Sequence, residues 1–129
     1  MARRAIVNAP GLAKALGPYS RAVWAGDLLY LSGQTGTDPA TGQLVSGGVA
    51  QQTEQVLKGL SAVLKEAGLS MADVVKANVY LTDINDFAIM NKVYEGFFDD
   101  PRPARTTVAV AALPGGARVE IELVAVKHS

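Results

Sequence analysis

The clearest periodic pattern in the chain lies between residues 49 and 67. Apolar or small side chains recur there at steps of three and four, and charged or amide side chains fill the positions between them. This pattern predicts an amphipathic helix that packs on a sheet. Gly68 is placed to end the helix, and Ser46 is a candidate for its N-cap. Gly59 costs about 1 kcal/mol relative to alanine within a helix, and we expect it to allow close packing on the sheet.

Several shorter stretches carry the alternation or the β-branched composition of strands. They cover residues 22–25, 28–32, 74–81, 104–110 and 118–126, and a further short strand begins at Ile6. The Gly-Asp pair at 26–27 indicates a hairpin between two of them. The turn at residues 113–117 is expected to join the last two strands directly.

A second helical pattern covers residues 87–98. Its aromatic residues and Met90 share one face, and Asn91 lies on the same side. In the preceding strand, 74–81, the alternation places Val75 and Ala77 on one face together with the two apolar residues that follow at the same parity. This face should meet the long helix.

The predicted elements follow the order β-ββ-α-β-α-ββ in a single domain, residues 1–129. Two helices against about six strands favour an α+β fold, a mainly antiparallel sheet with both helices on one face. The other face carries apolar side chains that are poorly suited to solvent, namely Val108, Val110, Val124 and Val126. We therefore expect this face to pack against other subunits.

Composition excludes several kinds of site. The chain of 129 residues has no cysteine, so disulfides and thiolate nucleophiles are impossible, and its single histidine, His128, stands beside the C-terminus. No spacing of metal ligands and no phosphate-binding loop occurs. Twelve basic and twelve acidic residues cancel, which argues against nucleic-acid binding as a main role. Without a signal peptide or a membrane-spanning stretch, the expected location is the cytoplasm, with no membrane partner.

The remaining candidates for chemistry are carboxylates, arginine, tyrosine and hydroxyls. Arg105 stands among small, hydroxylated and apolar residues, so it is either exposed at a strand edge or held to bind a carboxylate or phosphate. Glu120 lies within a strand, where a glutamate more often faces solvent or pairs with a neighbour such as Arg118 than acts as a base. Tyr19, presented from a rigid Gly-Pro turn, more often covers a core than a ligand. These residues alone do not name a reaction.

Six short motifs occur in an order and spacing that are together specific. They are Gly17-Pro18-Tyr19-Ser20, Ser32-Gly33-Gln34, Asp83-Ile84-Asn85-Asp86-Phe87 with Asn91, Pro103-Ala104-Arg105-Thr106-Thr107-Val108, Leu113-Pro114 and Val119-Glu120-Ile121-Glu122. In this combination the chain resembles the RidA/YjgF family of enamine and imine deaminases, over essentially its whole length.

The resemblance implies a chorismate-mutase-like α+β fold and a homotrimer with one cleft at each subunit interface. It also implies hydrolysis of reactive 2-imino acids and their enamine tautomers, such as 2-aminoacrylate and 2-iminobutyrate. The products would be a 2-keto acid and ammonia, and no cofactor or metal would be needed. The substrates would be by-products of pyridoxal-phosphate-dependent dehydratases. A non-catalytic trimer that binds small carboxylates as a regulator is the alternative.

Site residues follow from the resemblance position by position. Arg105 would bind the substrate carboxylate, and Glu120 would position or activate the attacking water. The remaining cleft residues would contribute hydrogen bonds or an apolar wall; they are Tyr19, Ser32, Gly33, Phe87, Asn91 and Thr107. Thr107 stands where some members have cysteine, which argues against a thiol mechanism.

Two features of this chain bear on that site. Arg21 stands where the family commonly has glutamine, and we expect its side chain to point to solvent. If the turn at 113–117 paired its strands with Val110 opposite Glu120, then Arg105 and Glu120 would lie on opposite faces of the sheet. They would share one site only through a shifted or bulged hairpin, or by coming from different subunits.

Overall fold

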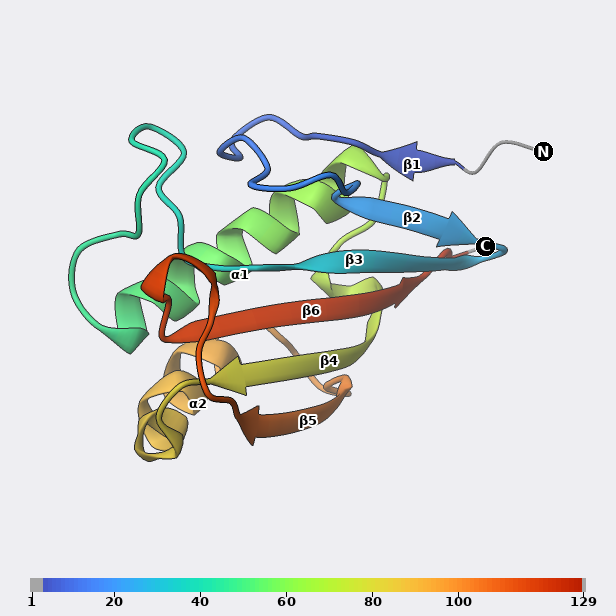
Figure 1. Ribbon diagram of the computed structural model, residues 1–129. Helices are drawn as coiled ribbons and strands as arrows, with labels where there is room; N and C mark the ends of the chain where they lie inside the picture. Colours follow the sequence, from blue (N-terminus) through green and yellow to red (C-terminus); the bar gives the residue numbers. More distant parts are fainter. Residues whose placement is uncertain (1–3, 129) are drawn as a thin grey trace.

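One mixed sheet of six strands organises the computed structural model, which describes residues 4–128. The strand order across the sheet is β1-β2-β3-β6-β4-β5 (Figure 1). The strands are β1 Ala5–Ile6, β2 Ala22–Ala25, β3 Leu28–Gln34, β4 Val74–Leu81, β5 Ala104–Ala109 and β6 Val119–Val126. The helices are α1 Val49–Glu66 and α2 Phe87–Glu95, with 3-10 turns at Met71–Asp73, Ile84–Asp86 and Pro114–Gly116.

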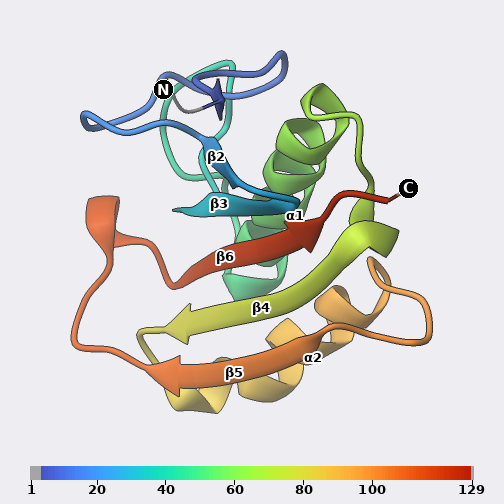
Figure 2. The ribbon, with the colours of Figure 1, turned by 90° about the vertical axis from the view of Figure 1, so that its right-hand side faces the viewer.

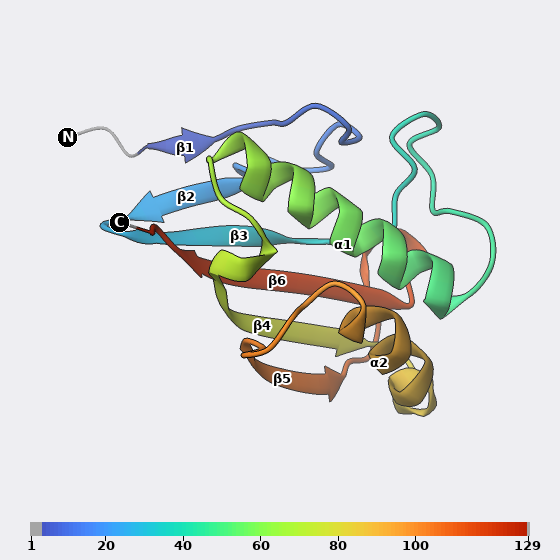
Figure 3. The same ribbon diagram turned by 180° about the vertical axis from the view of Figure 1, so that it is seen from behind.

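Both helices cover the same side of the sheet, as the sequence predicts. Figure 3 shows the covered side and Figure 1 the open side, and Figure 2 shows the ribbon turned by 90° from Figure 1. The core lies between the helices and the sheet. Its largest fully buried side chains are Leu29, Leu57, Leu60, Leu64, Leu81, Met90, Ile121 and Leu123. Neither helix of the described residues is long and apolar enough to cross a membrane.

Helix α1 confirms the periodicity argument nearly to the residue. Its C-terminal stop is Gly68, with φ of 79°. Its N-cap is Gly48 rather than Ser46, so the proposed cap was wrong. The Gln51 Oε1 atom accepts a 2.9 Å hydrogen bond from the Gly48 N–H, which satisfies the backbone donor of the N-cap residue.

The expected hairpin between the last two strands is wrong. Strand β5 pairs only with β4, and in parallel orientation, whereas β6 lies between β3 and β4 and is antiparallel to both. Parallel neighbours require a crossover connection, and α2 supplies it between β4 and β5. That crossover leaves β5 at the edge of the sheet, so the chain must pass β4 before it pairs again as β6.

This topology places Arg105 and Glu120 on opposite faces of the sheet. Arg105 pairs with Ala77, which also pairs with Leu123, and both of these neighbours are buried beneath the helices. Glu120 pairs with Tyr80 on the open face. Because paired residues on adjacent strands point to the same side, Arg105 faces the helices and Glu120 faces away from them.

Strand β4 carries a local irregularity that reverses one expectation. The pairing with β6 shifts between Val74 and Lys76, which leaves Val75 as the extra residue. Val74 is buried and Val75 is 45% exposed, so Val75 does not join Ala77 on the core face as the alternation predicts. A bulge of this kind inserts one residue and changes the parity of the strand.

The open face carries three of the four valines that the sequence places there, because Val110 lies beyond the end of β5. Val108 is 42% exposed, Val124 and Val126 are partly buried, and Tyr30 on the same face is 50% exposed. No helix among residues 4–128 covers this face, and only the loop between β5 and β6 crosses it, at the ends of β4 and β6 (Figure 1). Its contact with other subunits remains a prediction.

Gly59 gives a test of how α1 meets the sheet. A Cβ atom at this position would overlap Gln34 Oε1 and approach Leu12 Cδ2 at 3.3 Å. We expect Gly59→Ala to destabilise the protein by about 1–3 kcal/mol, because displacing the buried Gln34 amide outweighs the gain in helix propensity. Urea unfolding measures the difference. In the Gln34→Ala background the same change should cost less, whereas a stabilised Gly59→Ala single variant would contradict the packing argument.

Candidate functional site

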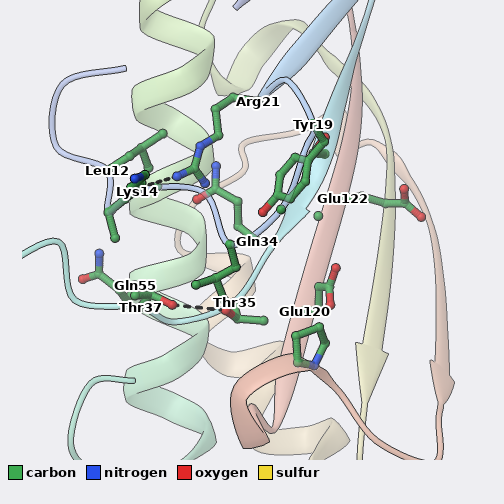
Figure 4. A pocket seen from close by; sticks show the side chains of 17 residues that line it. Leu12, Lys14, Tyr19, Arg21, Gln34, Thr35, Thr37, Gln55, Glu120 and Glu122 are labelled. Carbon is green, nitrogen blue, oxygen red and sulfur yellow. Dashed lines mark hydrogen bonds between the residues drawn. The ribbon is translucent and has the colours of Figure 1, made fainter. Parts of the chain in front are cut away.

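A cavity of about 580 Å³ lies between the loop that carries Tyr19, the ends of β3 and β6, and helix α1 (Figure 4). Four of the predicted site residues line it, namely Tyr19, Ser32, Gly33 and Glu120. They come from three separate segments of the chain. The cavity is therefore a product of tertiary structure rather than of one local motif.

Gly33 allows Glu120 to lie against the backbone of β3. A Cβ atom on Gly33 would overlap the carboxylate of Glu120. The pairing of β3 with β6 also shifts between Leu31 and Gln34, so the glycine sits at an irregularity as well as at a close approach. Ser32 Oγ donates a 2.7 Å hydrogen bond to the Ser20 carbonyl, which ties the strand to the loop bearing Tyr19.

The electrostatic surroundings of Glu120 favour its protonated form more than water does. Burial raises the pKa of Glu120 above its ordinary value of 4.5, and the neighbouring negative charge of Glu122 raises it further. Glu122 accepts a hydrogen bond from the Tyr80 hydroxyl. This bond, together with burial and the nearby carboxylates, raises the pKa of Tyr80 to about 12, so Tyr80 remains a donor at neutral pH.

Arg118 does not pair with the strand glutamates. Its Nη2 atom donates to both carboxylate oxygens of Asp86, each at 2.9 Å, and its backbone N–H donates to Gln52 Oε1 at 2.9 Å. Asp86 is 5% exposed, so this ion pair fixes the start of α2 to the start of β6. The interpretation of Glu120 as an ion-pair partner of Arg118 is therefore wrong.

A second polar cluster lies between β5 and α2. The Arg105 Cζ atom is 4.8 Å from the ring centroid of Tyr94 and 5.5 Å from that of Phe87, so two aromatic rings hold the guanidinium. No carboxylate of residues 4–128 forms an ion pair with Arg105. No sequence pattern indicates the contact with Tyr94, because a helical aromatic at that spacing is typical of a core residue.

Three buried acceptor-capable oxygens of this region have no hydrogen-bond partner within the described chain. They are Asn91 Oδ1, Tyr94 Oη and Thr107 Oγ1. Buried polar atoms in native proteins are usually satisfied. These three oxygens therefore require hydrogen-bond partners that residues 4–128 of one chain do not supply.

The predicted site residues therefore divide into two groups. Tyr19, Ser32, Gly33 and Glu120 line the cavity, whereas Phe87 and Asn91 on α2 and Arg105 and Thr107 on β5 do not. Within one chain, the sheet separates the carboxylate of Glu120 from the guanidinium of Arg105. The first group contains a carboxylate of raised pKa, Glu120, beside a cavity. The second contains a planar guanidinium, Arg105, which can bind an anion.

Arg21 contradicts the expectation that it points to solvent. Its side chain lines the cavity, the residue is 7% exposed, and its Nη2 atom donates to the Ala13 carbonyl. The loop of residues 12–19 folds back over it and removes it from solvent (Figure 4).

Comparison with known proteins places the chain among close relatives. A family model described as endoribonuclease L-PSP matches residues 8–127. A bovine protein (Bos taurus) named 2-iminobutanoate/2-iminopropanoate deaminase is 50% identical over 124 residues, which are 96% of this chain and 90% of the relative.

Solved structures agree over the whole fold. RidA from an Antarctic Psychrobacter species superposes with a TM-score of 0.90 at 45% identity, covering 95% of this chain and 99% of that one. TdcF of Escherichia coli with bound serine superposes with a TM-score of 0.89 at 38% identity, covering 97% and 100%. Both the motifs and the fold agree, and the chain belongs to the RidA/YjgF family, whose family model bears the description endoribonuclease L-PSP.

Proposed function

We propose that this protein deaminates reactive 2-imino acids by hydrolysis. The overall reaction is R–C(=NH)–COO⁻ + H₂O → R–C(=O)–COO⁻ + NH₃. The observation that carries the proposal is Glu120, a half-buried carboxylate of raised pKa held against Gly33 in an open cavity. A relative named as a 2-iminobutanoate/2-iminopropanoate deaminase at 50% identity supports it.

The reaction needs little activation by the protein, because the imine carbon is already electrophilic. Arg105 binds the substrate carboxylate through its planar fork. Glu120 accepts a proton from water as the water oxygen bonds to the imine carbon, and passes that proton to the imine nitrogen, which gives the carbinolamine R–C(OH)(NH₂)–COO⁻. Glu120 then accepts the hydroxyl proton and delivers it to the nitrogen as the C–N bond breaks, which releases ammonia and leaves the 2-keto acid. The enamine 2-aminoacrylate enters as its imine tautomer.

The two groups of residues act together only across a subunit interface. Arg105 and Glu120 lie on opposite faces of the sheet in one chain, so a site that contains both takes Arg105 from one subunit and Glu120 from its neighbour. We assign this arrangement to a homotrimer. The uncovered apolar side chains of the open face, including Tyr30 and Val108, and the unpartnered oxygens near Arg105 support such an assembly.

Small 2-imino acids such as 2-iminobutyrate and 2-iminopropanoate, formed by dehydratases in the cytoplasm, are the proposed substrates. Serine bound to the relative TdcF supports a ligand with the size and carboxylate of a small amino acid. A regulator that only binds carboxylates would require the Arg105 cluster but not Glu120 with its raised pKa. The structure thus favours the enzyme over that alternative.

The proposal is tested by coupling threonine dehydratase to the protein and following 2-ketobutyrate while semicarbazide competes for the imine. Acceleration is expected, and its absence in a correctly folded trimer would leave only the binding role.

Mixed trimers test where the site lies. Trimers reassembled from equal amounts of Arg105→Ala and Glu120→Gln subunits should recover about a quarter of wild-type activity, because a quarter of random interfaces pair an intact Arg105 with an intact Glu120. Each variant alone should be nearly inactive. No recovery after verified mixing, by native mass spectrometry, would contradict a site shared between subunits.

A further inference from the structure

The cavity reaches well beyond Glu120, into a polar recess that the deaminase reaction on small imines leaves unused. Arg21 and Gln34 lie on the α1 side of the cavity, opposite the β6 side that carries Glu120 (Figure 4). A volume of about 580 Å³ falls in the range of pockets for ligands much larger than 2-iminobutyrate. The recess therefore has room for a longer substrate side chain.

The recess contains two buried hydrogen-bond donors without acceptors. Arg21 and Gln34 are each 7% exposed, and Arg21 Nε and Gln34 Nε2 find no partner among residues 4–128. Both atoms are N–H donors, so they cannot satisfy each other. Because a buried unsatisfied donor is costly, the arrangement favours an acceptor supplied by a ligand.

The charge distribution identifies the kind of acceptor. Arg21 forms no ion pair with a carboxylate of the described chain, and Lys14 lines the same cavity. The two cavity carboxylates, Glu120 and Glu122, come from β6 on the other side. A guanidinium with a free Nε donor, next to an amide donor, matches a carboxylate oxygen in charge and hydrogen bonding.

We propose that Arg21 and Gln34 form a second carboxylate subsite, and that the protein favours 2-imino acids with a carboxylate at the end of the side chain. This substrate class rests on the proposed deaminase function. The reaction itself is unchanged: water replaces the imine nitrogen, and the distal carboxylate stays bound without reacting. The reaction that supplies such a substrate is a two-electron oxidation of the amine of an acidic amino acid.

Kinetics with two imine substrates, one with and one without a distal carboxylate, test the subsite. The imines of glutamate and of 2-aminobutyrate are generated in place by amino-acid oxidases with catalase, and their accelerated hydrolysis is followed against semicarbazide trapping. The ratio of kcat/KM for the glutamate imine to that for 2-iminobutyrate is expected to fall about ten- to hundredfold in Arg21→Gln, because a charge-assisted contact is lost. Gln34→Leu should lower it less. Lys65→Gln, at an exposed cation on α1, should leave it unchanged.

Product binding separates this proposal from the deaminase function. Calorimetric titration with 2-oxoglutarate and 2-oxobutyrate should show tighter binding of 2-oxoglutarate, with the difference lost in Arg21→Gln. Tighter binding of 2-oxoglutarate that is lost in Arg21→Gln, found without accelerated imine hydrolysis, would overturn the deaminase function and keep the subsite. Accelerated hydrolysis with a substrate ratio and product affinities unchanged in both Arg21→Gln and Gln34→Leu would overturn the subsite and keep the deaminase.

Discussion

Replacing Arg105 with alanine is expected to lower kcat/KM for 2-iminobutyrate by about 10²–10³-fold, the effect of losing a bidentate, charge-assisted contact with the substrate carboxylate. Most of the loss should appear in KM, because the carboxylate is bound equally in the ground state and in the transition state. Steady-state kinetics in the coupled assay measures both parameters.

Lysine at the same position separates charge from geometry. Arg105→Lys retains the positive charge but loses the planar fork that lies 4.8 Å from the Tyr94 ring centroid and 5.5 Å from that of Phe87. We expect it to recover only a small part of the activity. Arg102→Ala is the matched control, because Arg102 is an exposed arginine beside the same strand and pairs with exposed Asp100. An Arg105→Ala variant as active as Arg102→Ala would remove Arg105 from the site.

Glu120→Gln is expected to lower kcat by about 10²–10⁴-fold, the usual contribution of a positioned general base. Glutamine keeps the size and the polarity of the side chain beside Gly33 but cannot accept a proton. A loss confined to KM would show that Glu120 only binds the substrate.

The pH profile carries the stronger test of the same residue. Catalysis requires the ionised form of Glu120, and burial together with Glu122 raises the pKa of Glu120 above 4.5. As the pH is lowered, activity should therefore begin to fall at a higher pH than it would with a glutamate of ordinary pKa. In Glu122→Gln the like charge is gone, so the acidic limb should move to lower pH. A limb at the same pH in wild type and Glu122→Gln would exclude this electrostatic coupling.

Local patterns predicted the elements well where one face of the element is buried throughout. Helix α1 runs over Val49–Glu66, against an expected 49–67, because its apolar stripe and its terminal Gly68 are both local signals. The alternation in β6 also holds along its full length. In β4, by contrast, the bulge at Val75 depends on how β6 pairs with β4. No residue in β4 predicts this shift of register.

The candidate site was predictable as a set of residues but not as an arrangement. The motifs identified Glu120 and Arg105, and they placed Gly33 among the cleft residues. Tyr94 was missed because an aromatic on a helical stripe looks like core until the strand beneath it is known. Arg21 was misplaced because its burial depends on the loop of residues 12–19, which folds back over it.

By itself, the sequence determined the family, the two helices on one side of a six-stranded sheet, and the absence of thiol chemistry. Only the tertiary structure decided that Arg105 and Glu120 face opposite sides of that sheet and that Arg21 is buried in the cavity. The reason is physical. Periodicity along a strand fixes which residues share a face, but which face is covered by helices, and which strand lies next to it, depends on pairing between segments far apart in the chain.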